Sequence, residues 1–428
     1  MSGPSSVPTP VRDALPDDLD GTLSSLLLDL LGYDTQNPPG DTAGLASFVE
    51  DELGDAGIDH RRVVSDPAKP NVVATIDGDR SETLLFEGHL DTVPYDEAAW
   101  TREPRGERDG DTIYGRGATD MKGSLAAMLV VARAFATMDE PPPVDLGFVF
   151  VGEEEVPGDA GLETVLADDT VDAGACVIGE NTCEEGRHSV TVADKGSIWL
   201  TLQARGAAAH GSRPSMGQNA IDDLYAAIED LRGSLTEREL ALPPAVEPII
   251  EDSVAFYAPA LGESAARRLF RYPTVNLGTF EGGESINSVP ESATARLDVR
   301  LTAGVETPAV LEDIRTCLER HPTVSIAETS WSVGTYESPD GPLVGAVVDA
   351  ASAVVDERIY RRSATGGGDA KTLRNEGIST VEFALGNDSA HAVDEYTTLE
   401  ALRANTAVYA TVPYRFAERV DRQRDRSN

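Results

Sequence analysis

Five residues of types that bind metal ions lie far apart along this chain, and most of them stand where an apolar run ends. They are His89 in GHLDTVP, Asp120 in GRGATDMKGS, Glu155 in VGEEEVPG, Glu180 in CVIGENT and His391 in NDSAHAVDEY. Imidazole nitrogens and carboxylate oxygens are ligands that suit a zinc-like cation. We therefore expect the five side chains to converge and to support metal-assisted chemistry.

Two metal ions fit this set better than one. A single tetrahedral zinc needs four ligands, whereas two histidines and three carboxylates are available. In a two-metal site the ions lie about 3.5–4 Å apart and can share one bidentate carboxylate, a role that suits Asp120. Each ion would then also take one histidine and one glutamate. Asp91, two residues after His89, can accept the ring N–H that His89 does not use on the metal, which would fix the tautomer.

The apolar pattern predicts the elements that would position these residues. Strands alternate with helices, which indicates an α/β fold with a mostly parallel sheet flanked by helices. In such sheets ligands bind beyond the carboxyl ends of the strands, and the N–H groups at a helix terminus help to hold a carboxylate such as Asp120. The predicted elements are helices at 22–31, 45–56, 122–136 and 345–355 and strands at 71–76, 83–87, 146–151, 175–178, near 359 and at 380–385.

The middle of the chain has a different order of elements, which predicts a separate α+β unit. We expect this βαββαβ unit, at 196–334, to be inserted into a catalytic metal-binding domain at 21–195 and 335–428. Residues 1–20 are rich in Pro, Ser and Asp and predict a disordered N-terminal segment. The segment 236–272 fits neither unit and is interpreted as an elaboration of the insert. The insert's predicted elements are strands at 197–204, 274–280, 293–301 and 323–329 and helices at 219–231 and 308–320.

Charge and length exclude several classes of protein. The chain has 428 residues, a formal net charge of −39 at pH 7 and a pI near 4.3. Such a charge excludes an electrostatic grip on nucleic acid or on an anionic membrane. No apolar run reaches the length of a membrane span, and the N-terminus lacks the pattern of a signal peptide. We therefore expect a cytoplasmic protein with no nucleic-acid or membrane partner.

The charged residues also have an unusual composition. Lysine is rare beside abundant arginine and a large excess of carboxylates, which keep a protein hydrated at high salt. We interpret this surface as halophilic, the alternative being an acidic protein from a mesophile. The three cysteines are too few and too scattered for a disulfide scaffold and are expected to be reduced. The lysines are Lys69, Lys122, Lys195 and Lys371, and the cysteines are Cys176, Cys183 and Cys317.

From about residue 26 to residue 400, the segments resemble the dinuclear zinc amidohydrolases and exopeptidases. That family includes acetylornithine deacetylase, succinyl-diaminopimelate desuccinylase, aminoacylase and glutamate carboxypeptidase. The resemblance rests on GHLDTVP, GRGATDMKGS, EEEVPGDAG, VIGE, ARGAAAHGSRP, GGESINSVPESA, GGGDAK and AHAVDEY, which occur in the family's order. It implies a zinc-binding catalytic domain interrupted by a lid or dimerisation domain, two divalent ions (zinc, or else cobalt or manganese) and a homodimer formed through the insert.

The resemblance also assigns roles by position. One ion is assigned to His89 and Glu180, the other to Glu155 and His391, and the bridge to Asp120. Glu154 becomes the general base, which takes a proton from a metal-bridging water and delivers it to the leaving amine. The resemblance further implies a cis peptide bond between Asp120 and Met121.

Residues of the insert would complete the site. His210 in GAAAHGSRP would reach a partner subunit's active site and donate to the tetrahedral oxyanion, and one such donor is worth about 10²–10³ in rate. Asn287 and Arg300 match positions that contact the substrate or its carboxylate.

Three departures from the family pattern bear on substrate and register. Lys371 in GGGDAK stands where the family usually has arginine, so a point charge replaces a fork for the substrate carboxylate. The run Glu153–Glu155 replaces the usual Asp-Glu-Glu, and we fix its register by Gly158 and Gly161. Pro157 stands where glycine is frequent and stiffens that loop.

The implied reaction is hydrolysis of an amide bond. The segment YDTQNPPG and the long insert resemble acetylornithine deacetylases and succinyl-diaminopimelate desuccinylases more than dipeptidases. We therefore favour removal of an acyl group from an N-acyl amino acid, in the biosynthesis of arginine or lysine. The alternative is a zinc carboxypeptidase or dipeptidase on the same scaffold. A distant alternative is a catalytically inactive binding protein, against which the presence of every ligand and of the base argues.

Two further classes fit less well. An HxD motif with a distant histidine also describes the facial triad of Fe(II) oxygenases, but that fold is an all-β jelly roll and would leave Asp120, Glu155 and Glu180 idle. A nucleotide-binding interpretation of GRGATD lacks the third glycine of GxGxxG and a strand directly before it. The remaining histidines, interpreted as surface or structural, are His60, His188 and His321.

Overall fold

The computed structural model describes residues 7–168 and 173–427 and divides into two compact units. The first unit comprises Met1–Val192, Glu337–Arg361 and Gly368–Asn428, and the second comprises Ala193–Tyr336 and Arg362–Gly367. The chain thus leaves the first unit, builds most of the second and then returns.

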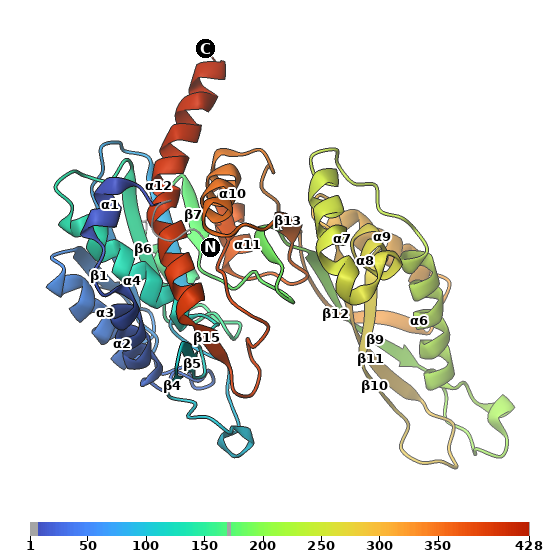
Figure 1. Ribbon diagram of the computed structural model, residues 1–428. Coiled ribbons are helices and arrows are strands. Elements are labelled where there is room, and N and C mark those ends of the chain that lie inside the picture. Colours follow the sequence, from blue (N-terminus) through green and yellow to red (C-terminus); the bar gives the residue numbers. More distant parts are fainter. Residues whose placement is uncertain (1–6, 169–172, 428) are drawn as a thin grey trace. The chain divides into compact units, whose positions relative to one another are not determined.

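The first unit is built on a large sheet in the strand order β1-β2-β6-β3-β7-β14-β8-β13 (Figure 1). Its central strands β6, β3, β7 and β14 are parallel to one another. Towards the edges, β2 pairs antiparallel with β1 and β6, and β8 pairs antiparallel with β14. The strands are β1 (Asp59–Val63), β2 (Asn71–Ile76), β3 (Thr83–His89), β6 (Asp145–Val151), β7 (Ala175–Ile178), β8 (His188–Ala193), β13 (Ile359–Ser363) and β14 (Ser379–Glu382).

Helices cover both faces of this sheet because its central strands are apolar on both sides. On one face, Leu85 and Val149 pack in a core with α5 and α11. On the other face, Phe86 contacts Tyr409 of the long C-terminal helix α12, red in Figure 1. The helices are α1 (Thr9–Ala14), α2 (Leu19–Leu31), α3 (Ala43–Asp55), the 3-10 helix η2 (Glu97–Ala99), α4 (Lys122–Thr137), α5 (Leu162–Ala167), α10 (Pro342–Val354), α11 (Asp369–Asn375) and α12 (Leu399–Ser427).

The predicted disorder of residues 1–20 is wrong for the part that the structure describes. Residues 9–14 form α1, and Val7 and Val11 are buried. The side chain of Asp18 accepts a hydrogen bond from the backbone N of Gly21 and so caps α2. The polar composition of residues 1–20 led to a wrong prediction because burial of only two valines is enough to hold so short a helix in place. Residues 1–6 lie outside the described part.

A small sheet holds two functional loops together. Its strands are β4 (Glu107–Asp109), β5 (Thr112–Tyr114) and β15 (Tyr396–Thr398), in the order β15-β5-β4. The antiparallel pair β15–β5 aligns Tyr396 with Tyr114. The residues just after β5 therefore lie beside those just before β15, although nearly 300 positions separate them in the chain.

The second unit is a layer of helices on an antiparallel sheet in the order β10-β11-β9-β12. Strand β9 alternates buried and more exposed residues, and its buried face packs against α6 and α9. The segment interpreted as an elaboration forms α7 and α8, which share a core of their own. The elements are β9 (Gly196–Arg205), the 3-10 helix η3 (Pro214–Met216), α6 (Ala220–Thr236), α7 (Glu247–Leu261), α8 (Glu263–Arg271), β10 (Thr274–Gly282), β11 (Ser292–Leu301), α9 (Thr307–Leu318) and β12 (Val324–Ser332).

The predicted fold class is confirmed, with a largely parallel central sheet between helices and an α+β unit. Among the described residues, no helix combines the length and the apolar character that crossing a membrane requires.

Candidate metal centre

The predicted ligands lie at the carboxyl edge of the large sheet, one at the end of a strand and the others in loops. His89 is the last residue of β3, and Glu180 lies two residues after β7. Glu155 follows β6, and His391 lies in the loop between β14 and β15. Because β6, β3, β7 and β14 run parallel, their carboxyl ends meet at one edge. Asp120 reaches this edge from the loop between β5 and α4.

The side chains form two groups that share Asp120. Nε2 of His89 lies 3.1 Å from Oδ1 of Asp120 and 3.2 Å from Oε1 of Glu180. Nε2 of His391 lies 3.0 Å from Oδ2 of Asp120 and 3.3 Å from Oε2 of Glu155. Within each group the ligand atoms all lie within 4.8 Å of one another. Asp120 thus turns one carboxylate oxygen to each group, which is the geometry of a bridging ligand.

The electrostatics of the two groups fit divalent cations. Hydrogen bonds to Asp120 and Glu155 raise the pKa of His391 to about 10. Burial acts to lower the pKa of His89, but hydrogen bonds to Asp120, Asp91 and Glu180 outweigh it and raise the pKa well above its ordinary value. The carboxylates thus hold a positive charge on each imidazole. A divalent cation in each group would supply that charge instead and release the imidazole protons.

The three consecutive glutamates after β6 point to three different partners. Glu153 pairs with Lys69, and Oε2 of Glu155 faces His391. Glu154 points towards Gly368, where a Cβ atom would lie only 2.7 Å from its Oε1. Burial, together with the charges of nearby carboxylates, raises the pKa of Glu154 to about 7. A carboxylate with this pKa can both accept and release a proton near neutral pH.

Asp91 contacts His89 and the glutamate loop in different ways. Nδ1 of His89 lies 2.9 Å from the backbone carbonyl of Asp91 and 3.4 Å from its carboxylate. The carboxylate accepts hydrogen bonds from the backbone N of Glu154 and of Glu155, at 3.1 Å and 3.2 Å, and from Nδ2 of Asn37 at 2.8 Å. Asp91 therefore orients the ring mainly through its carbonyl, and its carboxylate anchors the loop of the predicted base.

The pKa values of Asp120 and Glu180 also differ from their ordinary values. Burial acts to raise the pKa of Asp120, but hydrogen bonds to His391 and His89 hold it far below the usual range. Burial and the charge of Asp120 raise the pKa of Glu180 well above its ordinary value. Asp120, which contacts both histidines, is thus strongly ionised, whereas Glu180 would be ionised by a bound cation.

The predicted residues of the insert lie in the second unit. Nδ1 of His210 lies 2.9 Å from Oγ of Ser212. The backbone of Gly211 donates to the carbonyl of Asn287 at 2.7 Å, so the loops of His210 and Asn287 run side by side. Nε of Arg300 donates to Asp298 at 2.8 Å. The guanidinium of Arg300 therefore already has a carboxylate partner on its own strand.

The remaining predicted residues are distributed as follows. Lys371 lies on α11 in the first unit, and its backbone N donates to the carbonyl of Gly368, the residue beside Glu154. The Asp120–Met121 peptide bond is cis, as the resemblance implied. The other histidines contact groups outside the two ligand sets: His60 contacts Ile58, His188 contacts Cys183, and His321 contacts Asp230.

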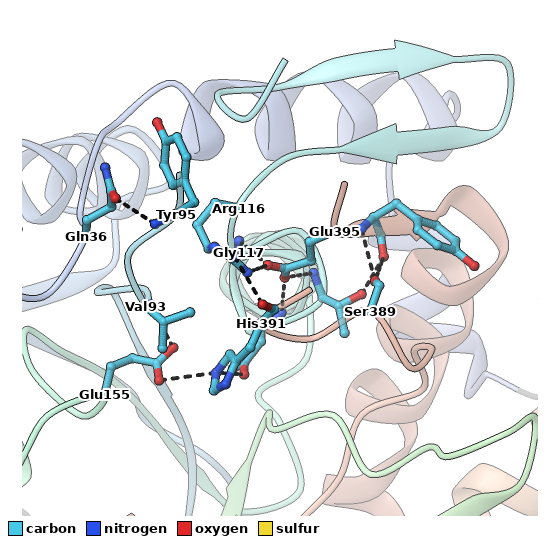
Figure 2. Close-up of polar contacts among 12 residues, drawn as sticks. Gln36, Val93, Tyr95, Arg116, Gly117, Glu155, Ser389, His391 and Glu395 are labelled. Atoms are coloured by element: carbon cyan, nitrogen blue, oxygen red, sulfur yellow. Dashed lines mark hydrogen bonds and ion pairs between the residues drawn. The ribbon is translucent and has the colours of Figure 1, made fainter. Parts of the chain in front are cut away.

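Three buried residues next to the ligands were not predicted from the sequence. Asn37 contacts Asp91, and Arg116 pairs with Glu395 at 2.6 Å (Figure 2). Glu395 belongs to AHAVDEY and Arg116 to GRGATD, so both lie within motifs that already drew attention. The sequence feature that could have indicated Arg116 and Glu395 is that each is a charged residue four positions from a predicted ligand. Their pairing depends on the tertiary fold and could not be inferred from spacing.

Comparisons with known proteins identify the family and the fold. The model of peptidase family M20/M25/M40 matches residues 85–415. A succinyl-diaminopimelate desuccinylase of Rhodospirillum centenum is 30% identical over 384 residues, which cover 86% of this chain and 91% of that protein. Among solved structures, an M20 family metallo-carboxypeptidase of Sulfolobus solfataricus is similar with a TM-score of 0.73 at 23% identity, covering 92% of this chain and 99% of that one. A dipeptidase of Saccharomyces cerevisiae is similar with a TM-score of 0.70 at 19% identity, covering 97% and 99%.

Proposed function

The chain belongs to peptidase family M20/M25/M40, and from this premise we propose that it is a metal-dependent amidohydrolase that removes the acyl group of an N-acyl amino acid. The observation that carries the proposal is the pair of ligand groups that share Asp120, with Glu154 beside them. The relative of Rhodospirillum centenum supports N-succinyl-diaminopimelate as substrate and a place in lysine biosynthesis. Acetylornithine is the second substrate of this type.

The proposed metal ligands are the five residues of the two groups. One ion would be held by His89, Asp120 and Glu180, and the other by Asp120, Glu155 and His391. We propose zinc, while cobalt and manganese suit the same nitrogen and oxygen ligands. When bound, such a pair of cations polarises the scissile carbonyl and makes a water molecule nucleophilic near neutral pH.

Glu154 is the proposed general base. Its carboxylate takes a proton from the attacking water and gives it to the nitrogen of the leaving amine, so that the carboxylate is regenerated. A pKa of about 7 suits both transfers. Asp91 keeps this loop in place by accepting the backbone N–H groups of Glu154 and Glu155.

The second unit supplies three of the proposed substrate contacts. His210 would donate to the developing oxyanion in a partner subunit's site, and Asn287 would contact the substrate. Arg300, which is bound to Asp298, and Lys371 of the first unit are the proposed contacts for the substrate carboxylate. The second unit thus serves as a lid and as the contact surface of a homodimer.

A carboxypeptidase or dipeptidase is the alternative. It has support in the names of the similar structures, a metallo-carboxypeptidase and a dipeptidase. Both reactions hydrolyse an amide bond in a substrate that carries a carboxylate. The same metal ligands and the same general base therefore serve either reaction.

One experiment separates these functions. Metal-loaded protein is assayed side by side with N-succinyl-diaminopimelate, N-acetylornithine and a set of dipeptides in high-salt buffer. We expect the largest kcat/KM for an acyl amino acid and loss of turnover on chelation, with recovery when zinc is restored. A larger kcat/KM for dipeptides would favour the alternative, and no hydrolysis of any substrate would indicate a binding protein.

A further inference from the structure

Glu395 is a buried carboxylate that the proposed chemistry does not use. Its side chain has no exposed surface. Oε2 accepts from Nη1 of Arg116 at 2.6 Å and from the backbone N of Gly117 at 3.0 Å. Oε1 accepts from the backbone N of Thr119 at 2.9 Å and of Asp120 at 3.0 Å. The loop that carries Asp120 therefore wraps around this one carboxylate, and Figure 2 shows its contacts with Arg116 and Gly117.

Arg116 extends the contact to a second ligand. Its Nη2 donates to the backbone carbonyl of His391 at 3.3 Å, and its guanidinium lies 5.4 Å from the ring centroid of Trp100. The backbone N of Gly115 also donates to the carbonyl of Glu395 at 2.9 Å. The pair Arg116–Glu395 thus joins the loop of Asp120 to the loop of His391 through side-chain and backbone contacts.

The two histidine ligands differ in how they are held. His89 is the last residue of a central strand, and its side chain is only 2% exposed. His391 lies in a loop, its side chain is 53% exposed, and its φ is +61°. A histidine in the left-handed region stays there only when its surroundings fix it. The carbonyl contact with Arg116 is one such constraint, so His391 depends on the buried pair and His89 does not.

A buried ion pair contributes little net free energy to the folding of a loop. Replacing such pairs by apolar residues is often neutral or stabilising, because removing two charges from water costs as much as their attraction returns. Fold stability alone therefore gives a weak reason for Arg116 and Glu395. A role in orienting the metal ligands is a stronger reason, since the loss of residues that hydrogen-bond to metal ligands lowers metal affinity about 10–100-fold.

We propose that Glu395, acting through Arg116, is a positioning residue that sets the affinity of the ion held by Asp120, Glu155 and His391. This inference rests on the proposed function in taking the two groups as metal sites. The ion held by His89, Asp120 and Glu180 depends on it less, because His89 is fixed by the sheet.

The test is titration of the metal-free protein with Co²⁺, followed by calorimetry and by visible absorption of the bound ion. Glu395→Gln keeps the shape but turns an N–H₂ group towards N–H donors. We expect wild-type protein to bind two ions. In Glu395→Gln, the affinity for the first ion should stay within about threefold of wild type, and the affinity for the second should fall about tenfold or more. Arg116→Lys, which keeps the charge but loses the contact with His391, should weaken the same ion.

Glu337→Gln is the matched control. Glu337 accepts from the backbone N of Thr380 at 2.9 Å and from Oγ of Ser379 at 2.8 Å, at the amino end of β14 and so at the opposite edge of the sheet. The Glu337→Gln substitution should lower the melting temperature and leave the affinities for both metal ions unchanged.

The proposal is overturned if Glu395→Gln and Arg116→Lys both bind two ions with wild-type affinity, or if Glu337→Gln weakens the second ion equally. Metal binding is measured without substrate, so the outcome is separate from that of the substrate panel. Wild-type protein that binds two ions but hydrolyses nothing would end the proposed function alone. Wild-type protein that takes up fewer than two ions would end both.

Discussion

At the scale of single residues, three adjacent glutamates show how surroundings assign different tasks to one side-chain type. Glu153 is paired with Lys69 and accepts from the backbone N of Ala160 at 3.2 Å, so it closes its own loop. Glu155 contacts His391, and Glu154 has the pKa of about 7 that burial among carboxylates produces. A general base needs the last of these environments.

We predict that Glu154→Gln lowers kcat by about 10²–10⁴-fold, because the amide cannot accept the proton of the attacking water. Metal content should stay at the wild-type level. The measurement is steady-state kinetics with metal analysis of the same preparation. Glu153→Gln is the control and should keep kcat within about tenfold of wild type, since its partner is Lys69. Near-normal turnover of Glu154→Gln would show that the base is misassigned.

Residue chemistry was predictable where a motif and the end of a strand coincide. His89, Glu155 and Glu180 each follow an apolar run, and that placement predicted convergence, which the distances bear out. Second partners were not predictable in this way. Asp91 contacts the ring of His89 through its backbone carbonyl. Every residue has such a carbonyl, so the residue type does not predict this contact. Glu395 likewise binds backbone N–H groups of a loop nearly 300 positions away, so only the folded chain reveals it.

At the scale of elements, most apolar strands were placed well, whereas the buried strand β8 and the exposed strand β1 were missed. The run 71–76 is buried over its first four residues and was predicted with its true bounds. Strand β1, with the sequence DHRRV, is an edge strand exposed over its first four residues, so its sequence carries no apolar signal. The helix α12 was also missed, although its first half has buried apolar residues and only its second half is rich in charged ones. Burial gives the pattern that sequence reasoning uses, and edges and exposed helix ends lack it.

The loop after β6 depends on a close backbone approach at Gly161. A Cβ atom there would lie 1.9 Å from the backbone O of Glu153. We predict that Gly161→Ala displaces the loop, costs about 1–3 kcal/mol of stability as overpacking does, and lowers both metal content and turnover. Thermal unfolding and metal analysis measure these effects. Gly174→Ala, where a Cβ atom meets nothing within 4 Å, should leave them unchanged. Wild-type metal content in Gly161→Ala would show that the loop tolerates the shift.

At the scale of the whole molecule, the net charge of −39 destabilises the compact state through the repulsion of like charges, and salt screens this repulsion. The Debye length falls from about 10 Å at 0.1 M salt to about 3 Å at 1 M. We therefore predict that Tm rises by roughly 5 °C or more between 0.1 M and 2 M KCl, measured by differential scanning fluorimetry. Sucrose at low salt is the control for solvent exclusion. A Tm independent of KCl would argue against the halophilic interpretation.

The proposed dimer makes a sharper prediction, because His210 would act in a partner subunit's site while Glu154 acts in its own. Glu154→Gln and His210→Ala should each be nearly inactive. In a heterodimer of the two variants, one site carries both substitutions and the other carries neither. Because a two-fold dimer has two equivalent sites, the heterodimer should recover about half of the wild-type kcat. Co-expression with two different affinity tags yields the heterodimer for steady-state kinetics, and each homodimeric variant is the control. A heterodimer as inactive as its parents would place His210 in the site of its own subunit, and failure to recover any heterodimer would argue against a stable dimer.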